Sequence, residues 1–289
     1  MAQQMMVETR PGRVEANDPA ELYLELLKRA LTGLLLREEF WPLRSTKTHR
    51  RVLAAAIERV LPQDLTLVRR KSIDLDAVMA GTGPPPPHAD TMVGLERLDN
   101  LHVLIKDVVE RSVPGDLMEC GVWRGGATVL MRGALEAYGE ANRAVWAADS
   151  FAGLPKPDEE RFPADAKSTL WMERDLAVSL DEVRATFARY GLLDDRVNFL
   201  PGWFRDTLPT APVERLAVLR LDGDLYESTI LALQSLYPKL SPGGYVIVDD
   251  YVPKHPACIR AVDDFLREQG EPVELKKAAT LGVYWQRPS

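Results

Sequence analysis

The chain has 289 residues, of which 46% are hydrophobic and 27% charged, an ordinary composition for a globular protein. This length can bury a sizeable core, and one α/β domain with an N-terminal extension fits it better than two equal domains. A net charge of −7 argues against a nucleic-acid-binding surface, which would be basic. The apolar stretches are too short to span a membrane, the N-terminus has no signal-peptide core, and only two cysteines occur. We therefore expect a cytoplasmic protein without a nucleic-acid or membrane partner.

The N-terminal part predicts two segments before the main domain. Residues 1–18 are polar and we expect them to be disordered, whereas residues 19–113 predict a helical extension with a lid. Within it, residues 81–90 contain four consecutive prolines and cannot form a helix or a central strand, so they predict a linker or a lid-like loop. Three stretches carry apolar residues at helical spacing: 22–34, 48–60 and 95–111.

Residues 114–289 alternate between strand and helix patterns, which predicts a parallel sheet covered on both faces. A short loop joins the last two strands, so we expect that pair to be antiparallel. The predicted strands are 116–119, 144–148, 197–200, 216–221, 245–248, 273–277 and 282–286. The predicted helices are 127–138, 180–190, 228–240 and 256–269, with a turn at 241–244 after the third of them.

Two of these strands end in paired carboxylates, which is the most informative feature of the sequence. Asp222 and Asp224 follow one strand, and Asp249 and Asp250 follow the next. A strand–helix–strand crossover makes the two strands parallel, so their tips lie at one edge of the sheet, about 5 Å apart if the strands are neighbours. Clustered carboxylates repel one another unless a cation neutralises them, and a hard divalent ion prefers oxygen ligands. Asp224 is equally explained as a helix cap or as a residue behind the ligands. The pattern predicts a metal-dependent site.

A glycine-bearing turn follows the first predicted strand of the main domain. Its spacing, Gly121-x-x-x-Gly-Gly126, differs from the Gly-x-Gly-x-x-Gly of dinucleotide sites. A glycine-bearing turn on its own is explained equally well by a structural role that involves no ligand. However, Asp149 ends the second strand, where an acidic residue accepts the hydroxyls of a ribose. Together these features predict a nucleoside cofactor without phosphates.

Four motifs in order carry a family resemblance: 118–126 (MECGVWRGG), 146–155 (WAADSFAGLP), 221–228 (LDGDLYES) and 243–251 (GGYVIVDDY). The chain resembles the macrocin O-methyltransferase family over residues 90–285 and again at 23–31. The resemblance implies a Rossmann-like class I methyltransferase fold with a mostly parallel seven-stranded sheet, an antiparallel last strand and a helical N-terminal extension. It also implies S-adenosylmethionine and Mg²⁺ as cofactors, a sugar hydroxyl on a glycosylated natural product as acceptor, and a homo-oligomer.

The resemblance also assigns residues. It implies that Asp222, Asp249 and Asp250 hold the magnesium ion. The cofactor-binding residues that it implies are Thr91, Met92, Glu119, Gly121, Asp149, Ser150, Gly202, Trp203, Phe204 and Asp222. A more distant likeness to the catechol O-methyltransferases puts Leu225 where those enzymes have a lysine base, so the base here must differ.

Methyl transfer to a hydroxyl requires a group that takes its proton. We expect Asp222 to be both a metal ligand and this catalytic base, and His255 is the alternative base. Residues 162–175 predict either a mobile loop that brings Trp171 and Arg174 to the acceptor or a surface helix. A non-sugar polyol or a phenol stays open as the acceptor. The clustered acids argue against a non-catalytic nucleoside-binding protein, and the missing diphosphate motif argues against a dehydrogenase.

Overall fold

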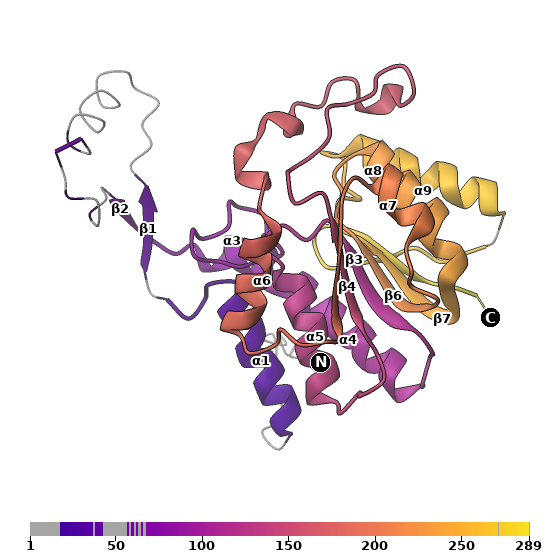
Figure 1. The fold of residues 1–289 in the computed structure, drawn as a ribbon, viewed down its shortest axis with the longest axis horizontal. Coiled ribbons are helices and arrows are strands. Elements are labelled where there is room, and N and C mark those ends of the chain that lie inside the picture. The colour runs from indigo at the N-terminus through magenta and orange to yellow at the C-terminus, as the bar shows by residue number, and fades with distance from the viewer. Residues whose placement is uncertain are drawn as a thin grey trace, which may run out of the picture.

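The computed structural model describes residues 18–36, 38–42, 57, 59, 60, 62, 65, 68–270 and 272–288. Its centre is a seven-stranded sheet with the order β5-β4-β3-β6-β7-β9-β8 (Figure 1). The five strands β3 to β7 are parallel, whereas β9 is antiparallel to both of its neighbours. The sheet confirms the predicted class I methyltransferase fold, including the antiparallel last strand. The strands are β3 (Asp116–Cys120), β4 (Val145–Asp149), β5 (Val197–Pro201), β6 (Leu216–Leu221), β7 (Leu240–Val248), β8 (Lys276–Lys277) and β9 (Val283–Gln286).

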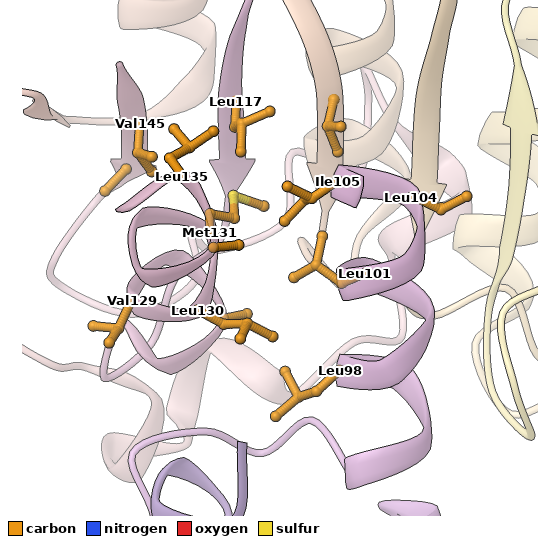
Figure 2. Packing of buried hydrophobic residues seen from close by; sticks show 14 of the residues in the cluster. Leu98, Leu101, Leu104, Ile105, Leu117, Val129, Leu130, Met131, Leu135 and Val145 are labelled. Carbon is orange, nitrogen blue, oxygen red and sulfur yellow. The ribbon is translucent and has the colours of Figure 1, made fainter. Parts of the chain in front are cut away.

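The two faces of the sheet are covered by different helices because side chains alternate along each strand. Leu117 of β3 belongs to one buried cluster and the next residue, Met118, belongs to the other. Figure 2 shows the first cluster, in which leucines of α4 and α5 pack against Leu117 and Val145. The helices associated with this cluster are α1 (Pro19–Leu31), α4 (Leu95–Glu110), α5 (Gly126–Ala137) and α6 (Leu180–Arg189), and those with the second are α7 (Phe204–Thr207), α8 (Tyr226–Leu236) and α9 (Pro256–Gln269).

The N-terminal extension contains an element that the sequence patterns did not predict. Strands β1 (Glu38–Pro42) and β2 (Val68–Ser72) form a separate antiparallel pair that stands away from the main sheet (Figure 1). The short helix α3 (Leu75–Ala80) follows it. The helix predicted for 48–60 lies almost entirely outside the described residues. Among the helices that the structure describes, none is both long and apolar enough to cross a bilayer.

The predicted helix 228–240 was wrong at its C-terminal end. Helix α8 ends at Leu236, one 3₁₀ turn follows at Tyr237–Lys239, and β7 already begins at Leu240. The residues predicted as a turn, 241–244, are the irregular start of β7. There the backbone N–H of Gly243 donates to Arg287, and the N–H of Arg287 donates to Gly244. Pairing with the segment after β9 therefore extends the strand through a sequence rich in turn residues.

The loop between β4 and α6 is neither fully irregular nor one helix. It contains three 3₁₀ turns, at Pro163–Asp165, Leu170–Met172 and Arg174–Leu176. The carboxylate of Asp165 accepts hydrogen bonds from the backbone N–H groups of Tyr226 and Glu227 at 2.7 and 2.9 Å. The loop is thereby fastened to the first turn of α8.

Candidate active site

A pocket opens where the parallel strands end at their C-terminal edge, which we call the strand-tip pocket. Most of the residues predicted to bind a cofactor line it. Thr91 and Glu119 are not among the lining residues: Thr91 accepts a hydrogen bond from the N–H of Val93, and Glu119 is buried behind the pocket. The predicted residues that line the pocket are Met92, Gly121, Asp149, Ser150, Gly202, Trp203, Phe204 and Asp222.

Gly121 brings the turn after β3 against the tip of β6. Its φ of +89° favours glycine, and a Cβ atom there would overlap the carbonyl oxygen of Asp222. The N–H of Asp222 donates to the carbonyl of Cys120 at 2.9 Å, which continues the β3–β6 pairing into the turn. The close approach of the two chains is what places Asp222 in the wall of the pocket.

Asp149 ends β4 and is held by two backbone donors. The N–H groups of Val122 and Phe151 each donate to one of its carboxylate oxygens at 2.8 Å. Burial raises the pKa of Asp149, and these two donors oppose that shift. The Ser150 hydroxyl lies 3.3 Å from Oδ1 as a further donor. Because a carboxylate has about four acceptor sites, the acceptor capacity for a ligand in the pocket lies mainly on Oδ2.

Behind the tips of β3, β6 and β7 lies a set of buried ion pairs, which we call the site cluster: Arg97, Glu119, Arg220, Asp222 and Asp249. Arg220, which is 2% exposed, contacts Glu119 and lies 3.0 Å from Asp222 and 2.8 Å from Asp249. Arg97 of α4 pairs with the other oxygen of Asp249. Burial raises the pKa of Glu119 to about 7, although Arg220 opposes the shift. Three acids thus share two arginines.

Two more acids adjoin the site cluster and have no arginine of their own among the described residues. Burial and the charges of Asp222 and Asp249 raise the pKa of Asp224 to about 7. The pKa of Asp250 is raised well above its usual value by burial and by Asp224, and its Oδ2 atom is buried without a hydrogen-bond partner in the described part of the chain. Carboxylates that neighbours push toward the neutral form are the kind that a divalent cation would ionise.

The structure does not bring the three predicted metal residues together as one set. Within the described residues, the three potential ligand atoms that lie within 4.8 Å of one another belong to Asp224, Asp250 and His255. Asp249 has both carboxylate oxygens paired with arginines. Burial lowers the pKa of His255, so its ring is neutral near pH 7 and can offer a lone pair.

Sequence patterns missed both arginines of the site cluster. A charged residue inside the buried strand LAVLRL was the available signal for Arg220, because a buried charge must be paired. Arg97 gave the weaker signal of a charge close to the buried residues Leu95 and Leu98 of the same helix. Gly153, Leu154 and Pro155, which also line the pocket, lie in a motif that carries the family resemblance but were assigned no role.

Comparison with known proteins agrees with this geometry. The macrocin-O-methyltransferase (TylF) family matches residues 20–287. The chain belongs to this family. It is therefore an O-methyltransferase, as its relatives are. The demethyldecarbamoylnovobiocin O-methyltransferase of Streptomyces niveus is 45% identical over 94% of this chain and 96% of its own. The mycinamicin III 3''-O-methyltransferase of Micromonospora griseorubida is 43% identical over 92% of this chain and 96% of its own.

Solved structures give the same picture of the fold. The O-methyltransferase NovP superimposes with a TM-score of 0.80 at 43% identity and covers 93% of this chain and all of its own. A calicheamicin methyltransferase, with a TM-score of 0.54 and 23% identity, covers 66% of this chain and 79% of its own and shares the fold. The similarity to NovP extends to the N-terminal extension, since so much of the chain is covered.

Proposed function

We propose that this protein transfers the methyl group of S-adenosylmethionine to a sugar hydroxyl of a glycosylated natural product, with Mg²⁺ as a second cofactor. The strand-tip pocket beside an excess of carboxylates is the observation that carries the proposal. The names of the relatives support the acceptor class, since one acts on mycinamicin III at a 3'' position and another on a rhamnosyl-tetracenomycin at a 4' position.

The lining of the pocket suits a nucleoside. We assign Asp149 to the two ribose hydroxyls, because its carboxylate ends β4 at the pocket and is fixed in place by backbone donors. Trp203 and Phe204, together with Gly202, form the wall for a planar base, and Met92 closes the pocket from the N-terminal extension. Ser150 borders the ribose side of the pocket. Thr91 and Glu119 support the site from behind in this proposal.

The donor set fits a magnesium ion. Asp250 has an unpartnered buried oxygen, and the acids of the region outnumber its arginines. We propose Asp222, Asp249 and Asp250 as the ligands, with Asp224 and His255 as the alternative donors that lie beside Asp250. When bound, the cation would make a nearby acceptor hydroxyl easier to ionise.

Asp222 is our candidate for the catalytic base. Burial and the charge of Asp249 raise its pKa, and Arg220 opposes that shift. A base whose pKa lies closer to neutrality takes a proton more effectively than an ordinary aspartate. Arg220 also fixes one carboxylate oxygen at 3.0 Å, so Asp222 presents the other to the pocket that it lines.

Calorimetric titration with S-adenosylhomocysteine, with and without Mg²⁺, tests the donor site. A mass-spectrometric screen of glycosides, polyols and phenols then tests the acceptor. We expect cofactor binding and a gain of one methyl group on a glycoside that a chelator abolishes. Turnover that survives the chelator would contradict the requirement for magnesium. Methylation of phenols but not of glycosides would show that the acceptor is a phenol.

We also propose a homo-oligomer, which the family membership supports. Light scattering on the purified protein measures its mass directly, and a monomer at micromolar concentration would contradict this part. A location in the cytoplasm stays a prediction.

A further inference from the structure

Glu227 is a buried acid in the strand-tip pocket that neither the metal site nor the proposed base uses. It lies in the first turn of α8, is 3% exposed and lines the pocket, as Trp203 and Phe204 also do. One carboxylate oxygen lies 3.2 Å from Arg205. The other, Oε2, is buried and has no hydrogen-bond partner among the residues that the structure describes. A buried acceptor without a donor is destabilising, so a ligand that supplies the donor is the simple explanation.

The backbone around Glu227 is satisfied independently of its side chain. The N–H groups of Tyr226 and Glu227 lie in the first turn of α8, where they have no acceptor within the helix. The carboxylate of Asp165 accepts a hydrogen bond from each of them. Asp165 therefore fixes the position of Glu227 without consuming its carboxylate. Arg205 contacts Oε1 of Glu227, and this contact also fixes the direction of Oε2 because the carboxylate is planar.

The position of Glu227 in the pocket indicates which part of the cofactor donates to its Oε2 atom. In the proposed function the ribose hydroxyls go to Asp149 on β4, and the planar base lies against Trp203 and Phe204. Glu227 contacts Arg205, the residue after Phe204, and lines the same pocket as Trp203, Phe204 and Leu231, which are planar or apolar surfaces suited to a base. Adenine carries one strong donor at its edge, the 6-amino group.

We propose that Glu227 accepts a hydrogen bond from the 6-amino group of the cofactor's adenine, with Arg205 as the positioning residue for its carboxylate. The inference rests on the proposed function, because it assigns one specificity-determining residue within that donor site. A hypoxanthine base has an oxygen in place of the amino group and would face the carboxylate with an acceptor. Glu227 would thus exclude deaminated forms of the cofactor.

The test compares S-adenosylhomocysteine with S-inosylhomocysteine by calorimetry on the full chain. The wild type should bind the adenine form at least about 100-fold more tightly, as expected when a buried polar group is left unpaired by the wrong ligand. Glu227→Gln has nearly the same shape and can donate to the inosine oxygen. We expect it to reduce the preference to within about 5-fold. Ser228→Ala, the next residue along the pocket wall, is the matched control and should keep the full preference.

Each outcome decides the matter. An unchanged preference in Glu227→Gln, or a wild type that binds both compounds equally, would overturn the inference. A changed KM for the acceptor with an unchanged nucleoside preference would place Glu227 at the acceptor and overturn it as well. If the wild type binds neither compound, the proposed function itself fails. Circular dichroism of both variants confirms that they are folded.

Discussion

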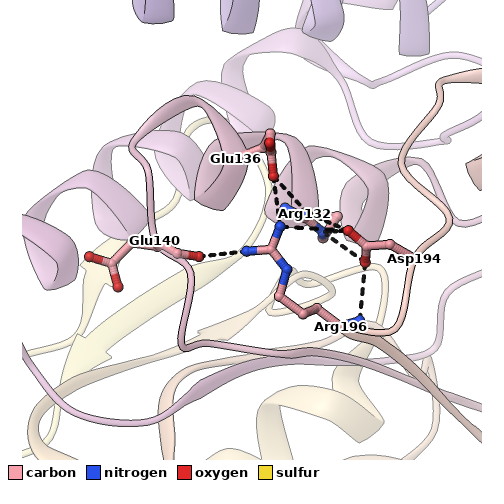
Figure 3. Close-up of polar contacts among 5 residues, drawn as sticks. All are labelled: Arg132, Glu136, Glu140, Asp194 and Arg196. Atoms are coloured by element: carbon pink, nitrogen blue, oxygen red, sulfur yellow. Dashed lines mark hydrogen bonds and ion pairs between the residues drawn. The ribbon is translucent and has the colours of Figure 1, made fainter.

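One group of arginines and acids lies at the C-terminal ends of the central strands β3, β6 and β7, and another lies before the N-terminal end of β5. The difference in their charge balance separates structure from function. The second group, which we call the brace cluster, consists of Arg132, Glu136, Asp194 and Arg196 and lies where the chain enters β5 (Figure 3). It has two arginines for two acids. In the site cluster two arginines serve three acids, and Asp224 and Asp250 adjoin it. A balanced group needs no further cation, whereas the group with excess acid has the capacity to bind one.

The largest effect should come from the site cluster. Asp222→Asn removes the proposed base while keeping the size of the side chain, so we expect kcat to fall about 1000-fold, within the range for loss of general-base catalysis. Binding of S-adenosylhomocysteine should change by less than about 5-fold. Steady-state kinetics and calorimetry measure the two quantities.

Asp194→Asn is the matched control, since it makes the same substitution in the brace cluster. Its kcat should equal that of the wild type at neutral pH. If Asp222→Asn retains more than a tenth of the wild-type kcat, Asp222 is not the base, and His255→Gln becomes the variant to measure.

Magnesium should stabilise the protein only through the acids of the site cluster and the adjoining residues Asp224, Asp250 and His255. At a concentration 100 times its dissociation constant, a bound ion adds about 2.7 kcal/mol to the free energy of unfolding. We expect Tm to rise by about 5 °C in a thermal melt. Asp250→Asn should abolish this rise, whereas Asp194→Asn should retain it.

The same melts decide between the donor sets. If Asp222, Asp249 and Asp250 are the ligands, His255→Gln keeps the rise in Tm and Asp249→Asn loses it. The reverse pattern would assign the ion to Asp224, Asp250 and His255, whose ligand atoms lie within 4.8 Å of one another.

Loss of an arginine in the brace cluster should affect stability alone. Arg132 is 2% exposed and contacts both Glu136 and Asp194, so Arg132→Met leaves the two acids with Arg196 as the remaining arginine of the brace cluster. Their side chains are 56% and 35% exposed, and solvent therefore compensates for part of the loss. We expect the free energy of unfolding to fall by about 2 kcal/mol, measured by urea titration. A reduced kcat per folded molecule would contradict a purely structural role.

The contrast also explains what the sequence could and could not predict. The strands and helices of the main domain could be predicted because they depend on local periodicity. The positions of the acids at the site could be predicted because these residues come directly after strands. Arg97 was not, because it joins Asp249 from 152 positions earlier in the chain. Which acids an arginine neutralises depends on that long-range packing, and the choice of metal ligands depends on it too. The irregular start of β7 was missed for a similar reason, since its partner is the segment after β9.

The smallest effect is a pH dependence of the brace cluster. Hydrogen bonding to Arg132 holds the pKa of Asp194 below its usual value, which is near 3.9 in an unfolded chain. The ionised carboxylate therefore contributes stability that is present above about pH 4 and is lost as the pH falls through the lower pKa of the folded state. Because the side chain is 35% exposed, screening limits this contribution to about 1 kcal/mol or less. The difference in unfolding free energy between the wild type and Asp194→Asn should thus be constant from pH 8 to about pH 5 and shrink toward zero below about pH 4. A difference that grew on acidification would mean that Asp194 is destabilised when ionised, and the brace cluster would then resemble the acid-rich site rather than contrast with it.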